Sequence, residues 1–253
     1  MWKKIRVMLL LIVLAIVAVN TWRDHNQDWT KPIIVLVHPI NADRLASTEK
    51  YIAQLNDTSF DGAKVYLQDM SKNYRGEKVP IYFKLGRTLS QVPPKVPENG
   101  SVLDNMLWSY KFKFYAWKQH KKEDGAPSVT LFMNYYDPNS TTTLKHSTAL
   151  EVGKIGSINV FASRDQAEQN KIVLVHELLH AFGASDKYDY VTGQPKYPEG
   201  YAYPDQKPLY PQMTAEIMAG HIALSEMKNT MPDYLGQTII NKTTATEIGW
   251  IKE

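Results

Sequence analysis

The sequence predicts an α/β (α+β) fold in which a twisted mixed sheet packs against helices, preceded by one N-terminal membrane helix. Short apolar and β-branched runs alternate with longer segments of helical periodicity along most of the chain, which indicates a layered arrangement. One uncharged apolar run stands apart at the N-terminus. The 253 residues are 43% hydrophobic and 22% charged, a globular composition that excludes a disordered chain.

The N-terminus has the pattern of an export signal. Lys3, Lys4 and Arg6 form a basic head, and the run from Val7 to Val19 that follows contains no charge and no proline. These three residues also account for the formal net charge of +3, because the rest of the chain carries 26 basic and 26 acidic residues. The domain therefore lacks the basic stripe that binds phosphates, and we expect no nucleic acid among its partners.

We expect this segment to remain as a membrane anchor. The apolar run spans only about 20 Å at 1.5 Å per residue, but no small-x-small cleavage site follows it, and Trp2 and Trp22 bracket it as interfacial aromatics do. The predicted organisation is an anchor over 1–22, a polar tether over 23–31 and one domain over 32–253. The N-terminus then lies in the cytoplasm and the domain outside the cell membrane, periplasmic or extracellular. Secretion after signal cleavage is the alternative.

The first half of the domain is expected to contain two strands with helices between them. Ile33–Val37 is a β-branched run, which predicts a buried strand. Apolar residues at helical spacing predict a helix over 45–55 and a shorter one over 63–70. From Val79 to Leu85, apolar residues alternate with Tyr and Lys side chains, which predicts the second strand.

A long helix is expected over Val102–Gln119, after a break rich in proline. It carries apolar side chains at spacings of three and four, the pattern of one helix face. We expect this face to pack in the core against the sheet, and a ligand-binding box is the alternative interpretation. Its members are Leu103, Met106, Leu107, Tyr110, Phe114 and Trp117.

Two further strands and a helix complete the predicted alternation. The strands are expected over Val129–Tyr136 and Ile155–Ala162, and the helix over Asp165–Phe182. The second half of this helix is apolar nearly all round, which is typical of a buried helix. A buried helix has little reason to carry ionisable side chains unless they are engaged, because their desolvation is unfavourable.

Ionisable residues nevertheless occur there, in the pattern H-E-x-x-H formed by His176, Glu177 and His180. Histidines four residues apart lie on one face of a helix, one turn from each other, so both imidazoles can reach one cation. Glu177 is rotated from His176 by about 100°. It is therefore expected beside the metal, where it can deprotonate a water.

A third ligand is expected downstream. Gly183 is placed to end the helix in a left-handed turn, which lets the chain double back and bring the Asp186 carboxylate to the same cation. Two imidazoles and one carboxylate leave the fourth tetrahedral position for water, as in catalytic zinc sites. Glu216 is an alternative ligand, and Asp189 and His221 are also open.

The string His176-Glu177-x-x-His180-x-x-Gly183-x-x-Asp186 resembles the elongated zinc signature of the metzincin peptidases, in the variant with Asp in place of the third His. Its Asp-Lys-Tyr-Asp continuation is similar to secreted bacterial members of that family. The resemblance implies Zn²⁺ held by the two histidines and Asp186, Glu177 as the catalytic general base, and a polypeptide substrate.

Metzincins also have a methionine in a tight turn beneath the metal and an edge strand that binds the extended substrate. Met218 lies in the segment Glu216–Gly220, 38 residues after His180, and matches the first element. An active-site helix followed by this Met-turn completes the predicted fold. The candidate for the edge strand is Gly156–Phe161, with an ordinary internal strand as the alternative.

The segment 184–215 is rich in proline and tyrosine. It either frames the cleft, where one tyrosine could donate a hydrogen bond to the oxyanion, or wraps the surface. His25, His38, His120 and His146 have no partner at metal-ligand spacing, and we expect each of them to be structural.

The predicted function is that of a membrane-tethered, extracytoplasmic zinc-dependent endopeptidase that hydrolyses peptide bonds through a metal-activated water. The chain contains no cysteine and no G-x-S-x-G motif, which excludes a cysteine nucleophile and argues against a serine one. An anchored zinc-binding or interaction module without hydrolytic activity is the alternative. A substituted Glu177 would have favoured it, and Glu177 is present.

Overall fold

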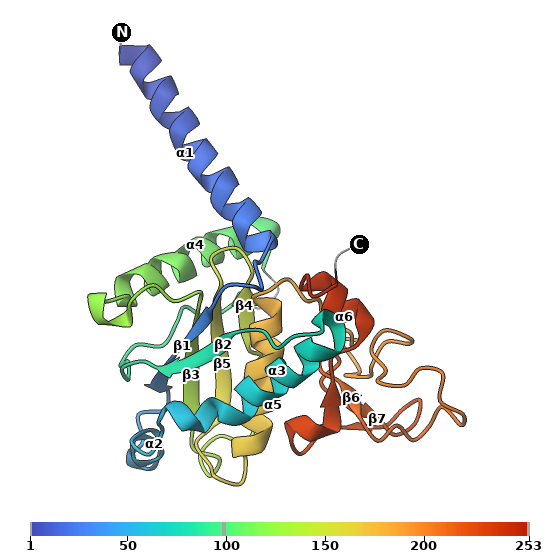
Figure 1. Cartoon of the computed structure of the whole chain (residues 1–253). Coiled ribbons are helices and arrows are strands. Elements are labelled where there is room, and N and C mark those ends of the chain that lie inside the picture. Colours follow the sequence, from blue (N-terminus) through green and yellow to red (C-terminus); the bar gives the residue numbers. More distant parts are fainter. Residues whose placement is uncertain (1, 98–99, 252–253) are drawn as a thin grey trace.

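The computed structural model describes residues 2–97 and 100–251, so Met1 of the predicted anchor and the last two residues of the predicted domain lie outside the described residues. The described part has an α/β fold in which a five-stranded mixed sheet packs against helices (Figure 1). An apolar helix, α1, projects from this body at the N-terminus. The predicted mixed sheet, its packed helices and the N-terminal apolar helix are therefore confirmed.

The sheet is parallel except at one edge. Its strand order is β2-β1-β3-β5-β4, and β4 pairs with β5 in the antiparallel sense. The four expected strands are confirmed, whereas β4 was not predicted because three residues are too few to show an alternation. The strands are β1 (Ile33–Asn41), β2 (Ile81–Leu85), β3 (Val129–Tyr136), β4 (Thr148–Leu150) and β5 (Ile155–Phe161).

One face of the sheet is covered by α3 (Asp61–Arg75) and α5 (Ala167–His180), with the short helix α2 (Ala46–Ile52) beside β1. Side chains of β1, β3 and β5 form the main core with these helices. The expected helices are confirmed in position. The second of them runs on to Arg75, because Gly76 adopts the left-handed conformation that ends a helix.

The other face of the sheet is covered by α4 (Val102–Gln119), which begins with a capping box of Ser101 and Asp104. Trp108 and Phe112 of α4 pack on Phe132 of β3 and form a second core. The prediction that the apolar stripe of this helix packs against the sheet is wrong. A second set of apolar side chains, on the opposite face of α4, makes the core contact instead. The stripe itself lies exposed on the outer face of α4 and consists of Leu103, Met106, Leu107, Tyr110, Phe114 and Trp117.

Helix α1 (Trp2–His25) is long and apolar enough to cross a membrane, and within the described residues no other helix is. It continues three residues beyond the predicted anchor, into the segment expected as a tether. The rest of that segment does not hang free, because Trp29 is buried against Phe182 and Trp250. Its indole N–H donates a hydrogen bond to the carbonyl of Ile248.

The chain beyond α5 forms a smaller subdomain of short elements at one end of the sheet. Two-residue strands pair as β6 with β9 and β7 with β8, and α6 closes the subdomain. The strands are β6 (Ala215–Glu216), β7 (Ile222–Ala223), β8 (Asn229–Thr230) and β9 (Thr238–Ile239), the helix is α6 (Lys242–Glu247), and the short 3₁₀ helices of the chain are Asp57–Phe60, Lys122–Asp124 and Leu235–Gln237.

Candidate metal centre

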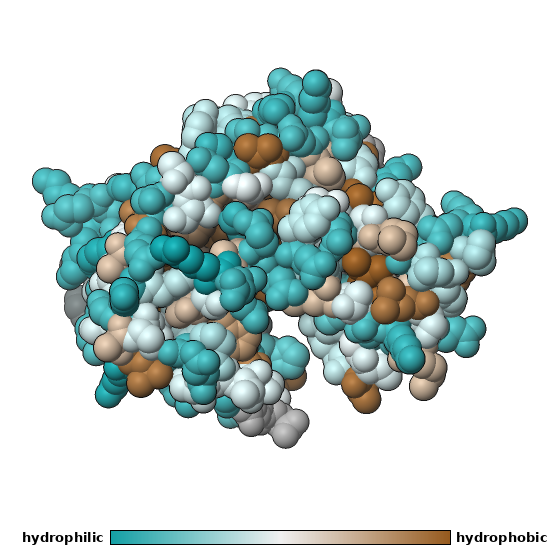
Figure 2. Space-filling view, turned by 90° about the horizontal axis from the view of Figure 1, so that it is seen from below, coloured by the Kyte–Doolittle hydropathy of each residue, from teal (hydrophilic) through white to brown (hydrophobic). Residues whose placement is uncertain are grey.

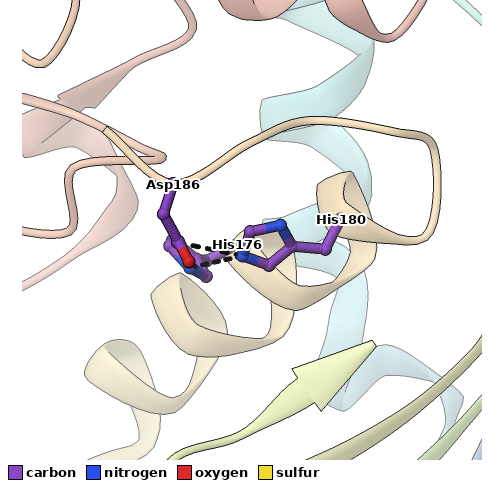
Figure 3. A group of neighbouring side chains, drawn as sticks. All are labelled: His176, His180 and Asp186. Atoms are coloured by element: carbon purple, nitrogen blue, oxygen red, sulfur yellow. Dashed lines mark hydrogen bonds and ion pairs between the residues drawn. The ribbon is translucent and has the colours of Figure 1, made fainter. Parts of the chain in front are cut away.

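The last turn of α5 presents His176 and His180 on the same side of the helix (Figure 3). The Nδ1 atom of His176 lies 2.9 Å from the carbonyl oxygen of Ile217, and Nδ1 of His180 lies 2.7 Å from that of Ala184. A carbonyl oxygen only accepts, so both Nδ1 atoms carry the proton and donate. In the neutral form of each ring the free lone pair is therefore on Nε2.

Gly183 reverses the chain after α5. Its φ is +100°, and the N–H of Ala184 donates to the carbonyl of Leu179, which closes the turn. The turn requires glycine for its conformation, and a Cβ at this position would also lie 2.9 Å from Oε1 of Glu151, whose flexible side chain would have to move. The predicted left-handed stop is confirmed, and it brings the chain back so that Asp186 faces α5.

Three ligand atoms converge at this point. Nε2 of His176 and Nε2 of His180 are 3.1 Å apart, and Oδ1 of Asp186 lies 3.1 Å from the first and 3.0 Å from the second. Ligands of a tetrahedral zinc, bound at about 2.0–2.1 Å, are about 3.3 Å from one another. Among the described residues, these three form the group whose ligand atoms are close enough to hold a cation. The donor set therefore fits zinc.

The charges of the group are strongly coupled. Burial raises the pKa of Asp186, but hydrogen bonds from both histidines outweigh it and hold that pKa far below its usual range. Burial lowers the pKa of His176, yet the hydrogen bond to Asp186 and the charge of Glu177 raise it to about 9. A proton shared by the two Nε2 atoms and Oδ1 of Asp186 thus relieves the repulsion between their lone pairs, as a bound cation would.

Glu177 lies beside the group. It is 5% exposed, and within the described part of the chain its Oε2 atom has no hydrogen-bond partner. Burial raises its pKa, against the lowering effect of His176 and His180. A buried carboxylate oxygen without a partner is costly, so its presence here points to a ligand or water in the neighbouring space.

That space is an open hollow of about 500 Å³ lined by the three convergent residues, Glu177, β4 and the segment after α5. The Tyr190 hydroxyl donates to Oδ2 of Asp186 at 2.9 Å, and Tyr188 lies with its ring 6.4 Å from that of His176. His146, expected to be structural, is also in this wall and lowers the pKa of Glu177 through its charge. Sequence reasoning missed His146, whereas Tyr188 and Tyr190 belong to the segment 184–215, for which framing the cleft was one of the two expectations.

Met218 occupies a tight turn that contacts the group from the C-terminal subdomain. The turn is closed by N–H groups of Ala219 and Gly220 that donate to the Glu216 carbonyl, and Gly220 has a φ of +69°. The Met218 side chain is fully buried. The turn touches the group once directly, where the Ile217 carbonyl accepts from His176, and once beside it, where the Met218 carbonyl accepts from the N–H of Lys187, the residue after Asp186.

Glu216, the alternative ligand, does not reach the group. Its Oε2 accepts from the N–H of Met218 at 2.6 Å and of Ala219 at 3.1 Å, while Oε1 accepts from the Thr244 hydroxyl at 2.7 Å. The carboxylate is fully buried. Glu216 therefore holds the Met218 turn in shape and ties it to α6.

The other two alternatives also lie outside the group. Asp189 caps its own loop, where Oδ1 accepts from the N–H groups of Val191 and Thr192. His221 is half-buried, and burial lowers its pKa, but it offers no atom to the group in the described structure. Asp186 is thus the carboxylate that the fold brings to the histidines.

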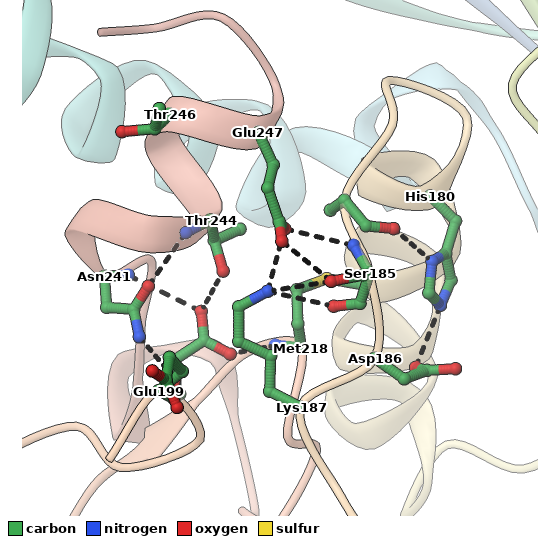
Figure 4. Close-up of polar contacts among 12 residues, drawn as sticks. His180, Ser185, Asp186, Lys187, Glu199, Met218, Asn241, Thr244, Thr246 and Glu247 are labelled. Carbon is green, nitrogen blue, oxygen red and sulfur yellow. Dashed lines mark hydrogen bonds and ion pairs between the residues drawn. The ribbon is translucent and has the colours of Figure 1, made fainter. Parts of the chain in front are cut away.

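A buried ion pair fixes the segment that carries Asp186. The Lys187 ammonium donates to Oε2 of Glu247 at 2.7 Å and to the carbonyl and hydroxyl of Ser185 (Figure 4). Glu247 also accepts from the N–H of Ser185. The residues on both sides of Asp186 are therefore bound to α6, a relation that spans some sixty positions and leaves no local signal in the sequence.

The edge of the sheet beside the hollow is β4. The expected edge strand, Gly156–Phe161, lies inside the sheet, because β5 pairs with β3 on one side and β4 on the other. The prediction of an edge there is wrong, and its stated alternative of an internal strand is correct. Thr148 and Ala149 of β4 contribute to the wall of the hollow instead.

Comparisons with known proteins add little. No family model matches the sequence, and no curated protein matches it. A solved structure described as "Structure of a chaperone-substrate complex" matches with a TM-score of 0.42 and 9% sequence identity, over 88% of this chain and 34% of that chain. This chain thus spans about a third of the length of that one. A likeness of this degree carries no argument about fold or function.

Proposed function

We propose that this protein is a zinc-dependent endopeptidase of the metzincin type, tethered outside the cytoplasmic membrane by α1. One observation carries the proposal. Nε2 of His176, Nε2 of His180 and Oδ1 of Asp186 converge within 3.1 Å beside the buried carboxylate of Glu177. Such a cluster of desolvated groups is unfavourable without a ligand that engages it, which supports a catalytic role.

The chain would hold zinc through these three atoms. A bound zinc would lower the pKa of a water molecule from 15.7 towards about 7 and polarise the scissile carbonyl. The hydrogen bonds from Nδ1 of His176 and His180 to carbonyl oxygens keep both rings oriented, as outer contacts of metal-binding histidines do. Tyr190 restrains the oxygen of Asp186 that does not face the histidines.

Glu177 has the role of general base and then general acid. Its unpartnered Oε2 accepts the proton of the attacking water and afterwards returns it to the leaving amine nitrogen. Burial raises its pKa towards the working pH, which makes the return of the proton easier. The reaction requires no side-chain nucleophile.

An extended polypeptide fits the edge strand β4. Among the described residues β4 is paired on one side, with β5, and residues of β4 line the hollow. A substrate strand can add to such an edge through main-chain hydrogen bonds. Its scissile peptide would then lie over the metal-binding residues.

The length of helix α1 supports a location at the membrane. The 24 residues of α1 span about 36 Å, enough for a hydrocarbon core of about 30 Å. We therefore propose a single-pass anchor with its basic end in the cytoplasm. Full-length protein should stay with membranes through high-salt and alkaline washes; soluble protein that begins near Asn20 would show a cleaved signal.

The deciding experiment compares the full chain with its Glu177→Gln variant on casein and on a broad peptide library. Because the amide cannot take or return a proton, we expect a folded, zinc-loaded variant that is slower by about 10²–10⁴-fold. Glu168→Gln is the matched control, since Glu168 is an exposed residue of the same helix, paired with Lys171. If wild type and Glu177→Gln are equally inert, the protein is an anchored zinc-binding module. If both cleave equally, the activity lies elsewhere.

A further inference from the structure

The outer face of α4 is an exposed apolar stripe, defined by Leu103, Met106, Leu107, Tyr110, Phe114 and Trp117. The exposed fraction ranges from 53% for Met106 to 75% for Leu103. At 100° per residue all six fall within an arc of about 100° along the whole helix. We propose that this stripe lies in the surface of the phospholipid membrane from which α1 rises, as a second point of membrane attachment.

The stripe is not explained by folding. The opposite side of α4 already makes the core contacts, through Trp108 and Phe112. A soluble surface rarely exposes a continuous apolar patch of this length, and such patches mark a site where a partner or a membrane binds. A helix that packs in the core on one face and exposes Trp, Phe and Leu on the other has the form of an interfacial helix.

The anchor meets the domain next to α4. The N–H of Gly153 donates to the Asp24 carboxylate at 2.9 Å, and His25 contacts Glu151 at 2.6 Å. A Cβ on Gly153 would lie 3.6 Å from the side chain of Lys113, which belongs to α4. Figure 1 shows α4 running across the end of the molecule from which α1 projects. A bilayer that contains α1 therefore lies on the side that carries α4.

The charges around the stripe match an anionic lipid surface. By helical geometry Lys111 and Lys118 border the stripe on one side and Lys113 on the other. Lysines in these positions extend their ammonium groups to phosphates while their stems cover apolar surface. The single acidic residue of the helix, Asp104, is engaged with Ser101 in the capping box.

The face remote from the anchor differs. Seen from below in Figure 2, it is covered mainly by hydrophilic residues, with hydrophobic ones scattered among them. In its described residues, that face shows no continuous apolar stripe like the one on α4. This inference depends on α1 and α4 and not on the peptidase proposal, so a protein without hydrolytic activity would still be expected to bind in this way.

The chain contains no cysteine, so single spin labels can be introduced at exposed positions of the full-length protein. We would label Phe114→Cys on the stripe, Val13→Cys in α1 and Val191→Cys, which is 93% exposed on a loop after α5. The protein is reconstituted in vesicles of phosphatidylcholine and phosphatidylglycerol. Each label is then measured for relaxation by oxygen, which partitions into lipid, and by a water-soluble nickel chelate.

The label at Phe114→Cys decides the proposal. We expect it to behave like the label in α1, with strong relaxation by oxygen and protection from nickel, while the label at Val191→Cys shows the opposite. A nickel-accessible label at Phe114→Cys would overturn the proposal, whatever the label in α1 shows. Protection with dipolar coupling between two labels at high lipid dilution would mean that a second copy covers the stripe, which also overturns it.

Exposed positions allow a second test that does not depend on the label. Leu107→Asp and Phe114→Asp replace exposed side chains, so the fold is expected to persist. Quenching of tryptophan fluorescence by brominated phospholipids should fall when both are present, because Trp117 leaves the lipid. Met227→Asp is the control, since Met227 is 87% exposed in the C-terminal subdomain. Equal quenching in all three proteins would contradict the proposal.

Discussion

The imidazole of His176 and the carbonyl of Ile217 are joined by a 2.9 Å hydrogen bond, and this contact links the two halves of the candidate metal centre. His176 belongs to a helix packed on the sheet, whereas Ile217 belongs to the C-terminal subdomain. The orientation of the His176 ring thus depends on a turn 41 residues away. Any change that moves the Met218 turn is therefore expected to reach the candidate metal centre.

The first prediction concerns metal content. Three convergent ligand atoms should bind close to one zinc per chain, and His180→Ala should abolish this binding, because two ligands no longer define a site. Elemental analysis of protein purified without chelator measures it. His120→Ala is a suitable control, since His120 is exposed and lies at the end of α4. Zinc-free wild-type protein would refute the metallopeptidase proposal.

The second prediction distinguishes the role of Asp186 as a ligand from the structural role of Glu216. Asp186→Ala should lose zinc and keep its fold. Glu216→Ala should instead lower the free energy of unfolding by more than about 2 kcal/mol, because it leaves two buried donors, the N–H of Met218 and the hydroxyl of Thr244, unpaired. Zinc titration and urea unfolding of both variants test this. Loss of zinc from a fully stable Glu216→Ala variant would contradict the roles assigned above.

The third prediction concerns the turn after α5. Gly183→Ala should cost about 1–3 kcal/mol of stability and also weaken zinc binding, because a side chain is strained at a φ of +100° and relaxation of the turn shifts the segment that carries Asp186. Gly125→Ala provides the matched control. Gly125 also has a positive φ, of +73°, but no atom lies within 4 Å of the added Cβ. A pair of variants with equal zinc affinity would show that the turn does not position Asp186.

The fourth prediction concerns acid. Burial raises the pKa of Glu247, but hydrogen bonds from Lys187 and Ser185 outweigh it and hold that pKa below its usual value. A carboxyl whose folded-state pKa is lowered adds stability above the unfolded value of about 4.3 and loses it as the pH falls through the folded value. Unfolding measured with chelator present should therefore show a loss of stability below about pH 4. Glu247→Gln should flatten this slope and be less stable at neutral pH. A slope that is unchanged in the variant would assign it to other carboxyls.

The sequence predicts the strands and helices of the main sheet because their apolar periodicity is long enough to distinguish the two kinds of element. It also predicts the grouping of His176, His180 and Asp186, since helix geometry and a left-handed glycine determine it locally. Other features depend on distant contacts. The ion pair of Lys187 with Glu247 joins separate segments, and β4 is too short to carry a pattern.

Helix α4 shows a different limit. Periodicity correctly indicates one apolar face, but it does not indicate what that face contacts. The helix has a second, smaller set at Trp108 and Phe112, and this set packs on the sheet. Burial of the larger set was the natural expectation in a water-soluble domain, and the structure leaves it exposed beside the anchor.

For the proposed membrane-tethered peptidase, the position of Trp29 has a consequence for how substrates would be met. Its ring is inserted between Phe182 and Trp250, so few residues remain free between α1 and the domain. With α1 in a bilayer, no long flexible linker separates the domain from the membrane, so the domain is held at a constant height above the lipid. Proteins embedded in the same membrane would then encounter the hollow by lateral diffusion in two dimensions. A substrate segment would reach the hollow only if it lies at the same height above the lipid. This height would thus limit the choice of substrate before any side chain is recognised.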